Sequence, residues 1–308
     1  MPPTRARARA GSRQLALRAA LPADAPALVS VQQVALDRET AGGARPHPVE
    51  DIGFEQAWFR HLLEGPDGRG WVAEVDGRCA GFSLAAARGG ITWLVSLFVE
   101  PQAQGQGLGR RLLETALGRA GERTRPVATF VDVASARAQL LYRAAGLHTV
   151  ACALALAGPP QKVRREKGLA MRPVEPTDAA ALETLDVDLR VGPRPAEHAF
   201  WEAAGCARRI LLDRQGLPQG YAIWSPNGRL GPLAVHRARS LPAALAACLG
   251  AMAESGHAHV RAMVPGDNPR ARDGLLEHGF RPLGMEVLMT DGRPPDWSRY
   301  LIHRAGLP

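Results

Sequence analysis

The sequence contains no run of eighteen consecutive apolar residues, the length at which a membrane-spanning helix becomes a candidate, so we expect no membrane span. The first fourteen residues, MPPTRARARAGSRQ, are basic but contain no apolar stretch, which argues against a secretory signal peptide. We interpret residues 1–14 as a basic, disordered arm. The 308-residue chain is 46% hydrophobic, which suits one large globular domain or two of ordinary size.

Cysteine is also scarce, since the chain has only four. No two of them are spaced as C-x-x-C, and none has histidines at the spacing of metal ligands, so the sequence predicts no metal site. Cysteines in apolar surroundings are usually small core residues. This usage fits a reducing compartment, and we expect a cytoplasmic protein.

Aromatic residues make up only 5% of the chain, too few for an obvious platform on which bases could stack. The net charge of +8 would by itself fit a nucleic-acid partner. Half of this excess, however, comes from Arg5, Arg7, Arg9 and Arg13 in the arm, and no later stretch forms a long basic run. The composition therefore argues against nucleic acid as the partner.

The chain carries an internal repeat. Residues 15–31 (LALRAALPADAPALVSV) resemble residues 169–185 (LAMRPVEPTDAAALETL), so that Arg18 matches Arg172 and Asp24 matches Asp178. Each copy predicts a strand, a turn and then a helix. We expect the aspartate to cap this helix by accepting hydrogen bonds from its first amides.

Later segments of the two copies correspond as well. A hairpin with Asp76-Gly77 at its turn matches a second hairpin in RILLDRQGLPQGYAIW. A later helix ends in each copy at a glycine, Gly146 or Gly279, the usual left-handed C-cap. Two tandem α+β units explain this better than one large domain.

The repeat sets the predicted domain boundaries. We place the first unit at residues 15–157 and the second at residues 169–308. The polar, proline-bearing segment GPPQKVRREKG, residues 158–168, is the predicted linker.

A glycine-rich stretch, LFVEPQAQGQGLGRRLLETAL, joins an apolar strand to a helix in the first copy. A dinucleotide fold needs a third glycine where Arg110 stands, and a P-loop needs G-K-[ST], whereas Gly109 is followed by two arginines. The remaining pattern, Q/R-x-x-G-x-G/A, is matched by Gln104, Gly107 and Gly109. On this motif alone, a turn that binds nothing stays an alternative.

The physical basis of this pattern is anion binding. Glycines let the backbone curl around an anion, and the unpaired first amides and the dipole of the following helix favour negative charge there. The helix would bury one apolar face, made of Leu108, Leu112, Leu113 and Ala116.

A second motif follows at the right distance. It reads N-x-x-A-x-x-x-Y-x-x-x-G-F in the GCN5-related N-acetyltransferase (GNAT) family, and here its positions hold Ser135, Ala138, Tyr142, Gly146 and Leu147. With both motifs, residues 15–157 resemble this family. The resemblance implies a mixed α/β (α+β) fold in each copy, with a twisted mixed sheet flanked by helices, and acetyl-CoA as co-substrate.

The resemblance also implies which residues bind acetyl-CoA. The loop would hold the pyrophosphate, the end of the preceding strand would pair with pantetheine through its backbone and polarise the thioester carbonyl, and Ser135 replaces the usual asparagine on the pantetheine side. The implied set is Leu97, Phe98, Val99, Gln104, Gly105, Gln106, Gly107, Leu108, Gly109, Arg110, Ser135 and Tyr142.

For catalysis, the resemblance makes Tyr142 the general acid, because a phenol stays protonated at pH 7 and can protonate a departing thiolate. The alternative is a tyrosine that only packs its helix. The base is open between Asp132, which we favour narrowly because a charge in the apolar strand TFVDV needs a reason, Glu100, and water alone.

The acceptor side is defined only loosely. In this family the early helices form the wall opposite the cofactor. They carry several acidic residues that would attract a cationic amine or would simply form a solvated face: Asp37, Glu39, Glu50, Asp51 and Glu55.

The second copy resembles the same family only in outline. LAVHRARSLPAALAACLG has lost the loop glycines, and Leu275 stands at the tyrosine position, so we predict a degenerate copy that does not turn over acetyl-CoA. This copy either closes over the acceptor or forms the contact of a homodimer.

Together these patterns indicate an N-acetyltransferase that moves an acetyl group from acetyl-CoA directly to a primary amine in a ternary complex. The acceptor is a small molecule or peptide that the sequence does not name. The alternative is a non-catalytic acyl-CoA-binding sensor or scaffold, which would need neither Tyr142 nor a base. The tyrosine is kept in the intact copy and lost in the degenerate one, which favours the enzyme.

Overall fold

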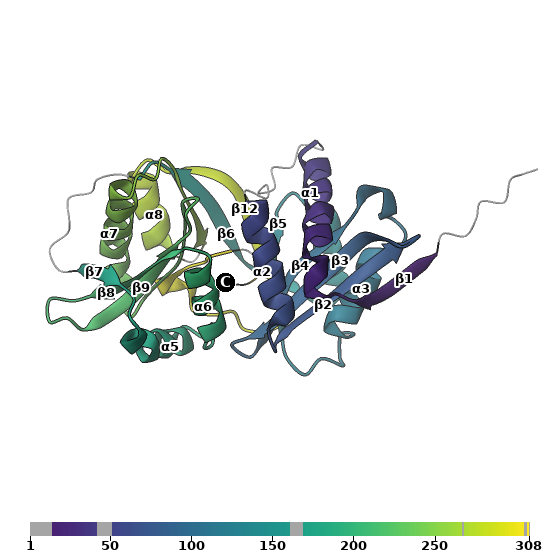
Figure 1. Ribbon diagram of the computed structural model, residues 1–308, viewed down its shortest axis with the longest axis horizontal. Coiled ribbons are helices and arrows are strands. Elements are labelled where there is room, and N and C mark those ends of the chain that lie inside the picture. Colours follow the sequence, from purple (N-terminus) through teal and green to yellow (C-terminus); the bar gives the residue numbers. More distant parts are fainter. Residues whose placement is uncertain (1–13, 42–50, 161–168, 267, 305–306, 308) are drawn as a thin grey trace, which may run out of the picture.

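The computed structural model describes residues 14–41, 51–160, 169–266, 268–304 and 307. The expected arm up to residue 13, Glu50 and most of the predicted linker lie outside the described residues. The two copies form two lobes, each with helices packed on a sheet (Figure 1).

The first copy runs through the following elements: β1 (Leu15–Ala19), α1 (Ala25–Ala41), α2 (Ile52–Glu64), β2 (Gly68–Val75), β3 (Arg78–Arg88), β4 (Ile91–Val99), α3 (Leu108–Leu117), β5 (Val127–Asp132), α4 (Ala136–Ala144) and β6 (His148–Gly158).

The second copy follows the same order and adds one short strand: β7 (Ala170–Pro173), α5 (Ala179–Asp188), α6 (Pro195–Ala203), β8 (Ala207–Leu212), β9 (Pro218–Trp224), β10 (Arg229–Val235), α7 (Leu241–Glu254), β11 (Val260–Pro265), α8 (Pro269–Glu277), β12 (Arg281–Thr290) and β13 (Tyr300–Leu301).

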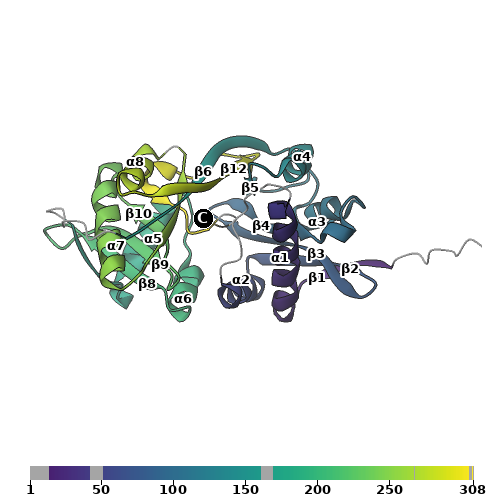
Figure 2. The ribbon, with the colours of Figure 1, turned by 90° about the horizontal axis from the view of Figure 1, so that it is seen from above.

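Within the described residues, the strands form one continuous sheet in the order β1-β2-β3-β4-β5-β12-β6-β11-β10-β9-β8-β7, and β13 pairs with β10. The order shows an exchange between the copies. Strand β12 of the second copy lies between β5 and β6 of the first, and β6 lies between β12 and β11. The two exchanged strands arch across the top of the molecule and join the lobes (Figure 2). Each copy therefore completes its sheet with a strand of the other.

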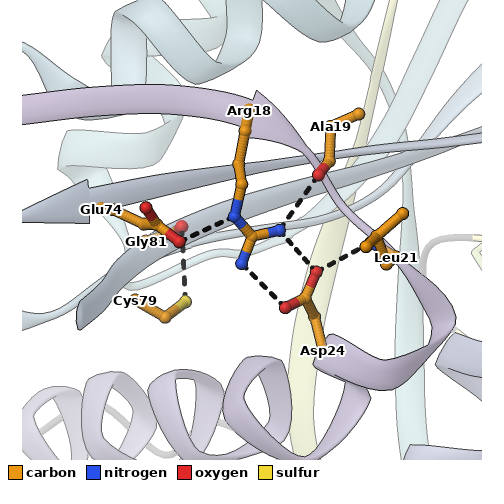
Figure 3. Close-up of polar contacts among 7 residues, drawn as sticks. All are labelled: Arg18, Ala19, Leu21, Asp24, Glu74, Cys79 and Gly81. Carbon is orange, nitrogen blue, oxygen red and sulfur yellow. Dashed lines mark hydrogen bonds and ion pairs between the residues drawn. The ribbon is translucent and has the colours of Figure 1, made fainter. Parts of the chain in front are cut away.

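The repeat recurs in the structure as one ion pair built twice. The Arg18 guanidinium donates to both carboxylate oxygens of Asp24, at 2.7 and 2.8 Å (Figure 3). Arg172 and Asp178 form the same bidentate pair at 2.7 and 2.9 Å. Arg18 also donates to Glu74, at 2.7 Å.

The prediction that these aspartates cap the following helix is wrong. Each carboxylate accepts a backbone N–H that precedes it in the chain, not the first amides of the helix. Each aspartate is the last residue of a 3-10 turn that precedes its helix, Pro22–Asp24 or Pro176–Asp178. From there the carboxylate folds back and accepts the backbone N–H three residues earlier, at 2.7 Å in the first copy and 2.8 Å in the second. The aspartate thus orders the turn that enters the helix.

The other local predictions are confirmed. Asp76 and Gly77 both have positive φ, 52° and 76°, as a type I′ hairpin turn requires. Gly146 and Gly279 end their helices with φ of 88° and 81°. The predicted apolar face of α3 is buried over all four of its residues, Leu108, Leu112, Leu113 and Ala116.

The largest apolar cluster crosses from one copy to the other. It contains Trp58 and Trp93 of the first copy together with Trp201, Trp297 and Tyr300 of the second. Helices α2 and α6 lie side by side at this junction (Figures 1 and 2). One shared core thus holds both copies in a fixed relation around the candidate site.

Candidate active site

The sheet opens between β4 and β5. These parallel strands pair only at Thr92↔Val127 and Trp93↔Ala128. Just beyond, the Thr129 hydroxyl donates to the carbonyl of Leu94, at 2.9 Å. A β-bulge shifts the pairing of β4 with β3 at this point. Among the described residues, no strand therefore pairs with the backbone of Ser96–Val99 on the β5 side.

A cavity of about 460 Å³ lies at this opening. Most residues expected to bind acetyl-CoA line it: Leu97, Phe98, Val99, Gln104, Gly105, Gly107, Leu108, Gly109, Arg110, Ser135 and Tyr142. Of the described residues expected at the site, Gln106 and Glu100 do not line the cavity. The Gln106 amide instead donates to the carbonyl of Gln102, at 3.4 Å.

The glycine loop has a backbone that favours an anion. Gly105 and Gly107 have φ of 81° and 77°, a left-handed conformation that a side chain would strain. Gly107 is the N-cap of α3 and contributes no side chain, and the first helical bond runs from Arg111 N to Gly107 O at 3.1 Å. The amides before Arg111 are thus available to a phosphate group, together with the dipole of α3.

Gln104 fixes this loop to the rest of the site. Its amide donates to the carbonyl of Val99 at 3.0 Å, and its Oε1 accepts from Arg137 at 2.7 Å. The loop is therefore tied both to the end of β4 and to α4 before any ligand binds. This arrangement fits an acyl-CoA whose pyrophosphate lies at α3 and whose amides pair with β4.

Tyr142 is 5% exposed and lines the cavity from α4. It packs with Val131 and Val287 in the cluster on the α3 and α4 side of the sheet. Burial, and then the charge of Glu39, raises the pKa of the phenol. The hydroxyl therefore stays protonated and can serve only as a donor acid near neutral pH.

The two carboxylates expected as bases lie in different places. Asp132 ends β5 and lines the cavity, where its Oδ1 accepts the N–H of Ala134 at 2.7 Å. Glu100 starts the turn after β4, and its charge acts on Cys79, whose pKa burial raises to about 11. Of these two carboxylates, Asp132 alone shares the cavity with Tyr142.

Ser135 begins α4 without capping it. Its hydroxyl donates instead to Glu39 of α1, at 3.4 Å. The corresponding Asn268 does cap α8, since its Oδ1 accepts the N–H of Ala271 at 3.1 Å. Its Nδ2 also donates to the carbonyls of Trp297 and Tyr300, at 3.0 and 3.2 Å.

These contacts close the matching opening in the second copy. Strand β13 pairs with β10, and Ile302 N donates to the carbonyl of Met263 on β11 at 3.2 Å. Residues 297–302 thus lie where β4 and β5 are open in the first copy. The helix after β10 also has Pro242 in its first turn, which removes one amide donor. Both features support the prediction that the second copy does not turn over acetyl-CoA.

The second copy contributes instead to the first cavity, which sequence reasoning missed. Its lining residues come from the turn between β9 and β10, from β10, β11 and β12, and from the C-terminal segment: Ser225, Asn227, Arg229, Met263, Glu286, His303 and Arg304. Arg304 forms an ion pair with Glu55 and lies 5.6 Å from the ring of Phe54 and 5.9 Å from that of Trp58. Helix α2 and the C-terminal segment therefore build one wall together.

Of the acidic residues on the early helices, Glu39, Asp51 and Glu55 line the cavity, whereas Asp37 is exposed away from it. A second-copy carboxylate joins them. Glu286 on β12 is 8% exposed and pairs in register with Asp132. Burial, and then the charge of Asp132, raises the pKa of Glu286 to about 7, while Arg229 opposes the shift.

A sequence signal for Glu286 existed. It interrupts the apolar strand GMEVLMT as Asp132 interrupts TFVDV, and a charge in such a strand needs a reason. Its position in the first copy's cavity could not be inferred, because that depends on the exchange of strands.

Comparison with known proteins agrees with this geometry. Residues 33–147 match the family model described as Acetyltransferase (GNAT) family. Among curated proteins, none matches the chain.

Several solved structures share the whole architecture. A proposed acetyltransferase from Pyrococcus horikoshii aligns over 100% of this chain and 99% of its own, with a TM-score of 0.75 and 16% identity. A GCN5-related N-acetyltransferase from Sphaerobacter thermophilus aligns over 91% and 96%, with a TM-score of 0.64 and 19% identity. A tandem GNAT protein from the clavulanic acid biosynthesis pathway aligns over 91% and 100%, with a TM-score of 0.65 and 18% identity. At these identities the likeness shows the fold, which is a tandem GNAT fold.

The described residues contain neither a candidate membrane span nor a candidate metal site. No helix there has the length and apolar character needed to cross a bilayer. In the same residues, no group of three or more His, Cys, Asp or Glu side chains is arranged to hold a metal ion.

Proposed function

We propose that the protein is an acetyl-CoA-dependent N-acetyltransferase, because residues 33–147 match the acetyltransferase (GNAT) family model. Its acceptor would be a primary amine of a small molecule or peptide, which attacks acetyl-CoA directly in a ternary complex. One observation carries the proposal. A single cavity connects the N-terminus of α3 and the open edge of β4 with Tyr142 and with a wall of acidic and aromatic side chains.

In this proposal, acetyl-CoA supplies the acetyl group as a thioester that an amine can displace. The loop Gln104–Arg110 holds the pyrophosphate through backbone amides and the dipole of α3. The open backbone of Ser96–Val99 holds pantetheine, and a backbone N–H there stabilises the charge that develops on the carbonyl oxygen. Ser135 faces the pantetheine arm, and its bond to Glu39 orients it.

Tyr142 gives its proton to the departing thiolate. Its raised pKa keeps the phenol protonated, and its burial excludes water from the leaving group. A carboxylate on the acceptor side receives a proton from the amine. Of the two carboxylates expected from the sequence, Asp132 lines the cavity and Glu100 does not. The cavity's acidic residues favour an acceptor that carries positive charge.

The first experiment tests binding and turnover separately. Acetyl-CoA is titrated into the protein by calorimetry, and thiol release from acetyl-CoA is then followed with a panel of polyamines, aminoglycosides, amino sugars and peptides. We expect binding, and thiol release with at least one class of amine. Absence of binding would contradict the proposal. Binding without turnover across the panel would favour a non-catalytic acyl-CoA sensor or scaffold.

The matched variant is Tyr142→Phe, which removes only the hydroxyl. We expect it to bind acetyl-CoA as the wild type does and to lower kcat about 10²-fold, because the general acid is lost. Tyr221→Phe is unsuitable as a control because Tyr221 forms a buried hydrogen bond to Asp186 at 2.5 Å. We also propose the cytoplasm as the compartment.

A further inference from the structure

We propose that Glu286, contributed by the second copy, is the general base that takes the proton from the acceptor amine in the first copy's active site. The inference rests on the proposed acetyltransferase function. It makes the catalytic apparatus a joint product of both copies, brought together by the exchange of strands.

The position of Glu286 relative to Tyr142 is the first argument. In an antiparallel pair, residues directly opposite each other point to the same face. Glu286 is opposite Asp132, and Leu288 is opposite Phe130. Leu288 and Phe130 belong to the core on the α1 and α2 side, whereas Tyr142 belongs to the cluster on the α3 and α4 side. The base and the acid therefore reach one cavity from opposite faces of the sheet, as attack and departure require.

The availability of the carboxylate is the second argument. Asp132 already accepts a hydrogen bond from Ala134, at 2.7 Å, and shapes the end of β5. For Glu286, by contrast, no hydrogen bond to its carboxylate is found among the residues that the structure describes. It is 8% exposed and lines the cavity. Its oxygens can therefore accept a proton from a ligand.

The charges around Glu286 set its basicity. Asp132 faces it from β5, Arg229 approaches from β10, and β6 places only Ala153 opposite it. Glu39, His303 and Arg304 line the same cavity farther along α1 and the C-terminal segment. Burial and Asp132 together raise the pKa of Glu286 to about 7. A base with a pKa near the working pH is both ionised in part and strong enough to accept a proton.

The proposed reaction transfers one acetyl group from the sulfur of coenzyme A to the nitrogen of the acceptor. An ammonium acceptor gives one proton to the Glu286 carboxylate and becomes a neutral amine. Its nitrogen forms a bond to the thioester carbonyl carbon, and the carbon–sulfur bond breaks. The nitrogen loses its second proton to solvent as the amide forms, Tyr142 protonates the thiolate, and solvent returns a proton to the Tyr142 phenolate. Glu286 then releases its proton to solvent. The products are the N-acetylated acceptor and free coenzyme A thiol, with one net proton released.

The test compares Glu286→Gln with Asp132→Asn and with the control Glu277→Gln, which alters an exposed residue of α8. The rate constant kcat/KM is measured against pH with acetyl-CoA and an amine identified in the panel. We expect Glu286→Gln to lower it about 10²-fold and to remove the limb that rises with pH. Asp132→Asn should stay active and move that limb to lower pH, because a like charge is removed. If Asp132 were the base, the two results would be exchanged, which would overturn the inference.

A second readout does not depend on turnover. The infrared spectrum of the wild type should contain a protonated carboxyl band that disappears as pH rises through about 7, and this band should be missing in Glu286→Gln. A wild-type spectrum without such a band would overturn the inference. Calorimetry should show unchanged acetyl-CoA binding to Glu286→Gln. Wild-type binding without turnover of any amine sinks the proposed function itself, whereas equal turnover by wild type and Glu286→Gln contradicts only the role of Glu286.

Discussion

At the scale of single residues, the proposed base Glu286 illustrates a conflict between catalysis and the stability of the fold. Its ordinary pKa is 4.5, and burial raises the pKa in the folded state to about 7. Between these values the folded chain binds more protons than the unfolded chain, so the free energy of unfolding falls as pH rises. A shift of this size destabilises the fold by about 3 kcal/mol once the group is fully ionised. A residue that costs stability at neutral pH has a reason to be there.

This leads to a stability prediction for Glu286→Gln. The amide has the shape of the acid and no charge, so the variant should be more stable than the wild type at about pH 8, by up to about 3 kcal/mol. Near pH 4 the two proteins should be equally stable, because the wild-type carboxyl is then neutral as well. Urea unfolding at both pH values measures this difference. A variant that is less stable than the wild type at pH 8 would show that the carboxylate supports the fold.

At the scale of elements, a second buried carboxylate joins the two copies. Its pKa is lowered, whereas that of Glu286 is raised. Glu197 on α6 is 2% exposed and forms an ion pair with Arg88 of β3, while His61 of α2 lies 3.9 Å away. Burial alone would raise the pKa of Glu197, but the nearby His61 ring and the hydrogen-bonded Arg88 guanidinium outweigh it and hold the pKa at about 2. This carboxylate therefore stabilises the fold above its ordinary pKa of 4.5 and loses that contribution as pH falls toward 2.

We therefore predict that Glu197→Gln lowers the free energy of unfolding at pH 7 by about 3 kcal/mol. The difference from the wild type should shrink as pH falls below about 4.5, because the wild-type carboxyl then gains a proton on unfolding. Denaturant unfolding across this pH range is the measurement. Glu202→Gln on the same helix is the control, since the Glu202 side chain is 67% exposed and its pair with Arg208 should contribute little. Equal effects of the two substitutions would contradict the prediction.

The distance along the chain between contacting residues explains which elements of the fold could be predicted from the sequence. Local patterns predicted the glycine loop before α3 and the hairpin turn at Asp76-Gly77, because each depends on residues close in sequence. The ion pairs Arg18–Asp24 and Arg172–Asp178 were not predicted, although the repeat matched their residues. The aspartate's role was predicted in the wrong direction, since a 3-10 turn precedes the helix. The exchange of β6 and β12 could not be inferred. Such pairing joins residues more than one hundred positions apart, such as Asp132 and Glu286, and both copies' patterns allow either partner.

The candidate site was likewise predictable only where its residues lie within one copy. Its cofactor side lies within one copy and follows sequence motifs, so most of its expected residues line the cavity. Its acceptor side is assembled from α2, β10, β12 and the C-terminal segment, and no motif records that assembly. The sequence suggested two roles for the second copy, and the structure favours closure over the acceptor, because Glu286, His303 and Arg304 line the first cavity.

At the scale of the whole molecule, the two copies differ at their equivalent clefts. The first keeps an open cleft between β4 and β5. The second fills the equivalent cleft with residues 297–302, and Asn268 donates to the backbone of this segment at 3.0 and 3.2 Å. The chain then continues into the first cavity, where Arg304 pairs with Glu55. One continuous segment thus closes the second copy and completes the acceptor wall of the first.

This difference predicts that the chain binds about one acetyl-CoA, because among the described residues only one cleft has the open strand edge and the glycine loop that the ligand needs. Gly107→Glu should abolish binding in calorimetry, since it adds a negative charge and a side chain at a φ of 77°. Ser240 occupies the matching N-cap position before α7, so Ser240→Glu is the control and should bind as the wild type does. If a second equivalent of acetyl-CoA bound, or if Ser240→Glu reduced the stoichiometry, the C-terminal segment would have to leave the second cleft, and the two copies would be two binding sites rather than one divided active site.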